Sequence, residues 1–175
     1  NATAVRVKVV SQNVVYLDYS VTASATSSGG TVTIAGFASN GSVLANFSLK
    51  NTLSDSAILF DYVLAIPSRN VALNWSASFA NISNTEVAVT LDMTVNGPNG
   101  NVRVLGTYGV NGGSFTVKVN GNLFATVMLD GNAGPVITGA NGEPLTAQEE
   151  QTLQTILDYY ATSLTAFSEL VTPLG

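Results

Sequence analysis

The chain has 175 residues, of which 46% are hydrophobic and only 10% are charged, and its formal net charge is −5. This length and apolar content predict one domain with a continuous core, and the six scattered basic residues offer no cationic stripe for nucleic acid. The chain has neither cysteine nor histidine, which excludes disulfides, thiolate chemistry, the commonest general base and the commonest metal ligand.

The polarity of the chain comes from serine, threonine, asparagine and glycine more than from charge. Soluble domains usually contain about 25% charged residues. A neutral surface rich in hydroxyl and amide groups suits the outside of a cell. We therefore expect an exported protein, extracellular or at the cell surface, whose leader has already been removed. No apolar run approaches the roughly 18 residues that span a bilayer as a helix, so no transmembrane segment is predicted.

Short stretches that alternate apolar and polar residues follow one another over residues 1–130. Such alternation is typical of a strand with one buried and one solvated face. Asn-Gly pairs such as Asn120-Gly121 separate several stretches and predict hairpins, because both residue types tolerate a positive φ. About ten antiparallel strands are expected, near Val5–Val9, Val14–Ala23, Thr31–Phe37, Val43–Lys50, Ala57–Ile66, Val71–Phe79, Glu86–Val95, Val102–Tyr108, Ser114–Val119 and Leu123–Leu129.

The fold class expected from these strands is mainly β, an antiparallel sandwich of jelly-roll-like form with one C-terminal helix packed on it. The stretch Ile58–Ile66 is apolar on both faces, which predicts a strand buried on both sides, centrally or by a partner. Trp75 shares a face with Leu73 and Phe79, which predicts a core position. Residues 24–30 form a loop of small residues, and a second loop, rich in glycine, asparagine and proline, is predicted over 131–145.

The pattern changes near the C-terminus, where apolar residues recur with the three-and-four spacing of one helical face. Thr146 and Glu149 have the spacing of a capping box, so a helix is predicted over 146–171, completing a single domain over 1–175. We expect the helix to cross one open face or end of the sheet. Its packing face comprises Leu153, Ile156, Leu157, Tyr160, Leu164 and Phe167.

Paired carboxylates are the remaining route to catalysis without histidine. Asp18, Asp61 and Asp92 each fall in a predicted strand, but no motif flanks them, and we expect solvated side chains. The stretch 130–134 resembles the opening of a calcium loop, yet Pro135 and Asn141 depart from that pattern, which favours a plain turn. We therefore expect no catalytic residue, no cofactor and no metal site.

The first strand offers a possible donor-strand interface through Val5, Val7 and Val9. A short amphipathic strand at a free chain end can complete the edge of a neighbouring sheet. The alternative is an ordinary edge strand, on which Arg6 and Lys8 discourage aggregation. The sequence leaves both interpretations open.

The segment Phe47-Ser48-Leu49-Lys50-Asn51-Thr52, followed by the strand Ile58–Ile66, resembles the strand and turn of secreted β-sandwich subunits of the TasA/camelysin type. Those proteins form extracellular matrix fibres. The resemblance implies a jelly-roll-like subunit that polymerises by strand exchange and has no active site.

Two functions follow from the sequence. The first is a non-catalytic structural or adhesive protein of the cell surface, which pairs strand edges with copies of itself or with other surface proteins. The alternative is an exported carrier of a small hydrophobic ligand, with the C-terminal helix as its lid.

Overall fold

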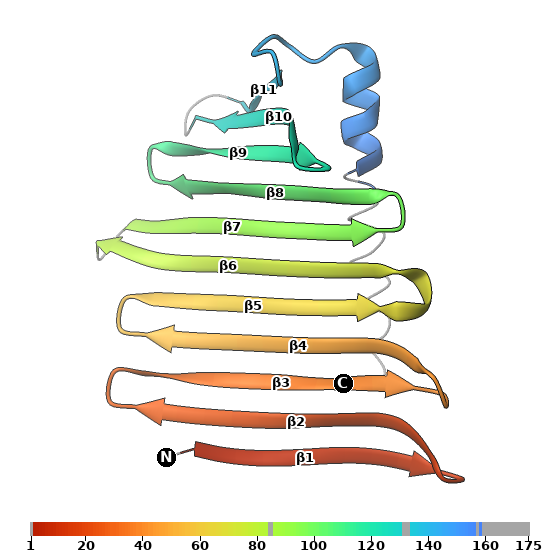
Figure 1. The fold of residues 1–175 in the computed structure, drawn as a ribbon. Coiled ribbons are helices and arrows are strands. Elements are labelled where there is room, and N and C mark those ends of the chain that lie inside the picture. Colours follow the sequence, from red (N-terminus) through yellow and green to blue (C-terminus); the bar gives the residue numbers. More distant parts are fainter. Residues whose placement is uncertain (1, 84–85, 131–133, 157, 159–175) are drawn as a thin grey trace.

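The structure, a computed structural model, describes residues 2–83, 86–130, 134–156 and 158. Within them, eleven strands form one antiparallel sheet in which each strand pairs with the next in the chain (Figure 1). A short 3-10 helix, η1 (Pro67–Arg69), links β5 to β6, and residues 147–156 are helical. The strands are β1 (Ala2–Ser11), β2 (Val14–Thr26), β3 (Gly29–Ser39), β4 (Val43–Ser54), β5 (Ala57–Ile66), β6 (Val71–Ser83), β7 (Glu86–Gly97), β8 (Gly100–Gly109), β9 (Gly112–Val119), β10 (Asn122–Leu129) and β11 (Val136–Gly139).

Tight turns explain why consecutive strands pair. Asn120 and Gly121 have φ angles of 51° and 82°, as the predicted Asn-Gly hairpin requires. Gln12 and Asn13 make the first turn with φ angles of 50° and 63°. The predicted loop over 24–30 is wrong at both ends, because β2 continues to Thr26 and β3 begins at Gly29.

The sheet has two chemically different sides, because the pairing register aligns the alternation of neighbouring strands. The apolar face carries Val5, Val7, Val9, Tyr19, Val21, Val32, Ile34, Phe47, Leu49, Leu53, Ile58, Phe60, Tyr62, Leu73, Trp75, Phe79, Val87, Val89, Leu91, Val95, Val104, Tyr108, Val117 and Ala125. The polar face carries Arg6, Lys8, Asp18, Ser20, Thr33, Ser48, Lys50, Asp61, Ser76, Thr90, Asp92, Thr94, Arg103, Thr116 and Lys118.

The mainly β class with a C-terminal helix is confirmed, whereas the described strands do not form the two layers of a sandwich. All eleven belong to one open sheet, and consecutive pairing leaves no strand for a second layer. The predicted loop over 131–145 also contains β11. Alternation identifies strands that have a dry side, but it does not say what covers that side.

The C-terminal helix packs on one end of the apolar face. Leu153, only 7% exposed, forms a buried cluster with Val117 and Ala125. The predicted capping box is present: the Thr146 backbone N–H donates to the Glu149 carboxylate at 2.8 Å, and the Glu149 N–H donates to Thr146 Oγ1 at 3.3 Å. Of the other predicted packing residues, Ile156 is half-buried. The remaining four lie outside the described residues: Leu157, Tyr160, Leu164 and Phe167.

Candidate functional site

The carboxylate of Asp18 lies on the polar face and is already paired. Arg6 Nε and Nη2 donate to its two oxygens at 2.8 and 2.7 Å, and Asp18 is 6% exposed. These hydrogen bonds, more than the positive charges of Arg6 and Lys8, hold the pKa of Asp18 below its ordinary value. The group is therefore an ionised partner in a cross-strand pair.

Asp61 and Asp92 flank Ser76 from the two neighbouring strands. Ser76 Oγ donates to Asp61 Oδ1 at 2.9 Å, and Arg103 donates to both oxygens of Asp92 at 2.8 and 2.5 Å. The hydrogen bonds from Arg103 lower the pKa of Asp92. A hollow of about 210 Å³ lies beside these groups and also touches Thr94. The structure thus brings Asp61 and Asp92 to one row, while Asp18 lies on β2, three strands away from Asp61 on β5.

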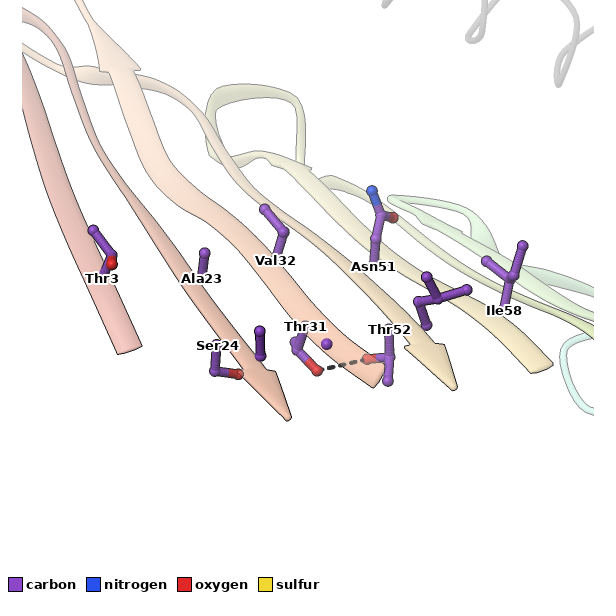
Figure 2. A pocket seen from close by; sticks show the side chains of 11 residues that line it. Thr3, Ala23, Ser24, Thr31, Val32, Asn51, Thr52 and Ile58 are labelled. Atoms are coloured by element: carbon purple, nitrogen blue, oxygen red, sulfur yellow. Dashed lines mark hydrogen bonds between the residues drawn. The ribbon is translucent and has the colours of Figure 1, made fainter. Parts of the chain in front are cut away.

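The apolar face is hollowed near the ends of β2 to β7. One hollow of about 430 Å³ runs over Ala23, Gly30 and Val32 to Leu53 and Ile58, and Figure 2 shows the side chains that line it. A second hollow of about 620 Å³ shares Leu53 and Ile58 and continues to Phe60, Phe79 and Val87. Small residues on β2 and β3 beside larger ones on β4 and β5 produce the first depression. The two hollows, which meet at Leu53 and Ile58, are together called the trough.

Large apolar side chains around this trough are only partly covered. Leu53 is 56% exposed, Val87 45% and Val32 42%. Exposed apolar patches of this kind mark surfaces that meet a ligand, a membrane or another protein. We therefore regard the trough as a candidate binding surface.

Aromatic rings gather on the apolar face where β5 and β6 pair. Tyr62 and Trp75 lie directly opposite each other, with ring centroids 4.9 Å apart in an edge-to-face arrangement. Phe60 stacks on Trp75 at 6.4 Å and meets the edge of Phe79 at 5.8 Å. Trp75 is half-buried in this cluster, so it packs with its neighbours as expected but is not fully enclosed.

The two edges of the sheet differ. Among the described residues β1 has β2 as its single neighbour, and its outer edge is ten residues long. Val5 and Val9 on this edge strand are 55% and 48% exposed, and Val7 is half-buried. At the other edge β11 has only four residues, and the chain folds back on it through a bridge between Thr138 and Pro144.

The hydrogen bond of this bridge runs from the Gly139 N–H to the Glu143 carbonyl at 2.7 Å. Proline has no N–H to offer a further strand, so Pro144 also weakens this edge as a template. Within the described part of the chain, the sheet therefore presents one long free edge and one covered edge.

The comparisons leave the site to be interpreted from its own geometry: no family model, no curated protein and no solved structure matches the chain. Over the described residues, no three acidic side chains lie together as a metal site would need. In the same part of the chain, no helix combines the length and the apolar character that crossing a membrane requires. Residues 131–133 of the segment that resembles a calcium loop lie outside the described residues.

Sequence reasoning identified the three strand carboxylates and the valines of β1 but missed the pairing of Arg6 with Asp18. The turn at residues 12–13 would by itself place Asp18 opposite Val7, and a register shift between Val9 and Val10 moves Asp18 opposite Lys8 and next to Arg6. The turn was therefore an incomplete signal for this pairing. The trough had no such signal, since a depression depends on the sizes of residues from several strands at once.

Proposed function

We propose that this protein is a non-catalytic structural subunit, extracellular or at the cell surface, that associates with copies of itself through a strand edge. The observation that carries the proposal is the free outer edge of β1, ten residues long, in a sheet whose other edge is covered. An edge strand presents unpaired backbone N–H and C=O groups, which pair readily with another chain.

The chemistry of the polar face supports a role without catalysis. Asp18 and Asp92 are bound by arginines and Asp61 accepts a hydrogen bond from Ser76, so each of these carboxylates has a structural partner. The low charge content supports an exported protein, and the resemblance of residues 47–52 to matrix-fibre subunits points to the same class.

We also propose that the apolar faces of two copies stack against each other, so that each copy forms one layer of a sandwich. The apolar face over β1 to β7 measures about seven strands by eight residues, or roughly 900 Å². A standard interface buries about 800 Å² on each partner. Stacked apolar faces would supply the second layer, and combined with edge pairing they would extend an assembly into a fibre or matrix.

Electron microscopy and sedimentation velocity of the full chain test the proposal. We expect discrete assemblies larger than one chain, and a variant lacking residues 1–10 should lose them while keeping its β-type circular dichroism. Assemblies that persist unchanged without these residues would exclude the β1 edge as the interface.

The trough favours a second candidate function, the transport of a hydrophobic ligand. Its two hollows share Leu53 and Ile58 in their linings, and their apolar side chains suit an aliphatic chain. Solvent extraction and mass spectrometry of the purified protein test this function. A stable monomer that retains a stoichiometric lipid would favour the carrier function over the structural one.

A further inference from the structure

We infer that two copies of this chain pair β1 against β1 in an antiparallel register centred on Val7, and that this contact closes as a two-fold dimer. The inference rests on the proposed function and deepens it by naming the partner strand and the register. It concerns the outer edge of β1, with Val5, Val7 and Val9 on one side and Arg6 and Lys8 on the other.

The difference between the two edges selects the partner. A head-to-tail contact would place β1 of one copy against β11 of the next, and repetition would give an open filament. That route is hindered because β11 is short and the bridge from Thr138 to Pro144 occupies its outer side. The free edge that remains on a second copy is its own β1, and a contact between identical surfaces closes with two-fold symmetry.

The two faces of the sheet select the direction. A two-fold axis perpendicular to the sheet pairs the two β1 strands antiparallel and keeps both apolar faces on one side. An axis along the strands would pair them parallel and put the apolar faces on opposite sides. The antiparallel arrangement therefore continues one apolar face across both copies, from Val5 and Val21 of one chain to the same residues of the other.

The valines select the register. Residues directly opposite each other share a face, so odd positions must face odd positions. When Val7 faces the partner's Val7, Val5 faces the partner's Val9 and all three valines are paired. A shift by two residues in one direction places Arg6 against the partner's Arg6, and the opposite shift places Lys8 against the partner's Lys8. Only the register centred on Val7 pairs every valine, so the apolar contacts and not the charges select it.

The charges are compatible with this register. Arg6 faces the partner's Lys8, but Asp18 binds Arg6 through two hydrogen bonds and lies directly opposite Lys8 in the β1–β2 pairing. Each Asp18 thus offsets part of the cationic charge at the contact. The remaining repulsion is screened by salt, so the dimer should be tighter at high ionic strength.

Disulfide formation between single-cysteine variants tests the register of the β1–β1 contact, because the chain has no cysteine of its own. Paired residues of an antiparallel sheet have Cα atoms about 4.5–5.5 Å apart, within the range that a disulfide spans. V7C should form a covalent dimer on mild oxidation, whereas V5C and V9C should form one only when the two are mixed. V136C is the matched control, since Val136 on β11 is 56% exposed, close to the 55% of Val5.

The yield from V7C should exceed that from V136C by about tenfold or more, because paired cysteines have a high effective concentration. Self-linking of V5C or V9C alone would overturn the register while leaving self-association intact. A dimer in sedimentation that none of the β1 cysteines can link would overturn the β1 contact and point to the apolar face. An unmodified protein that sediments only as a monomer would overturn the proposed function itself.

Discussion

Arg6 on β1 donates from Nε and Nη2 to both carboxylate oxygens of Asp18 on β2, at 2.8 and 2.7 Å. Asp18 is one of two buried polar residues in the described part of the chain, and its pair with Arg6 ties the edge strand to the body of the sheet. A bidentate pair of this kind fixes geometry as well as adding attraction. The stability of β1, and so the presentation of its outer edge, depends on this contact.

We expect Asp18→Asn to destabilise the β1–β2 hairpin. An amide has one oxygen acceptor and its NH₂ group opposes the arginine donors, so one of the two hydrogen bonds is lost. The melting temperature should fall by about 2–5 °C. Asp92→Asn is the matched control, because Asp92 and Arg103 form the same bidentate pair with side chains 41% and 45% exposed. The melting temperature of Asp92→Asn should change by less than about 1 °C. Equal decreases for the two variants in a thermal melt would contradict the role of burial at Asp18.

Stability should fall in acid. Hydrogen bonds from Arg6, Arg103 and Thr146 lower the pKa values of Asp18, Asp92 and Glu149 in the folded state. A lowered pKa contributes stability that is fully present above the unfolded value of about 4 and is lost as the pH falls through the folded value. Urea unfolding midpoints measured from pH 7 to pH 2.5 should therefore be level down to about pH 5 and then decrease. Asp18→Asn should flatten this decrease, and an unchanged slope would argue against the Asp18 contribution.

Leu153→Ala should undock the C-terminal helix from the sheet. The side chain is 7% exposed and packs on Val117 and Ala125, so its truncation leaves a cavity in the buried cluster that joins the described part of the helix to the sheet. The free energy of unfolding should fall by about 2–5 kcal/mol. Gln151→Ala, at an exposed position of the same helix, should change it by less than about 0.5 kcal/mol. Chemical denaturation of both variants makes the comparison, and similar losses would mean that the helix does not depend on this contact.

Gly36→Ala tests how closely the strands pack around β3. Gly36 pairs with Tyr19 and with Phe47, whose rings approach to 6.5 Å from the two sides of it. A Cβ at this position would lie 2.2 Å from the Asp18 backbone oxygen, so the backbone must shift. We expect a loss of about 1–3 kcal/mol in unfolding free energy.

Gly109→Ala is the control for this substitution, because a Cβ there meets nothing within 4 Å. Its unfolding free energy should stay close to that of the unmodified chain. If the two alanine variants unfold at the same denaturant concentration, the close approach at Gly36 does not limit stability.

Local signals in the sequence were sufficient for ten of the eleven strands, for the start of the helix and for their order along the chain, but not for β11. Alternation in β6, the Asn120-Gly121 turn and the capping box of Thr146 with Glu149 each depend on residues within a few positions of one another. These interactions act through backbone geometry and are independent of the rest of the fold. For the same reason Val5, Val7 and Val9 could be recognised as one face of a strand before their surroundings were known.

Tertiary structure alone decided the number of layers, the free and covered edges, and the trough. The same alternating strands can form a sandwich or one open sheet, because alternation specifies a dry side without specifying what lies on it. The trough gathers residues of β2 to β7, and the free edge of β1 exists because all eleven strands pair in chain order, neither of which a local pattern encodes. The sequence by itself determined ten of the eleven strands and which side of each is apolar, and the packing of those strands decided which of their surfaces remain available to a partner.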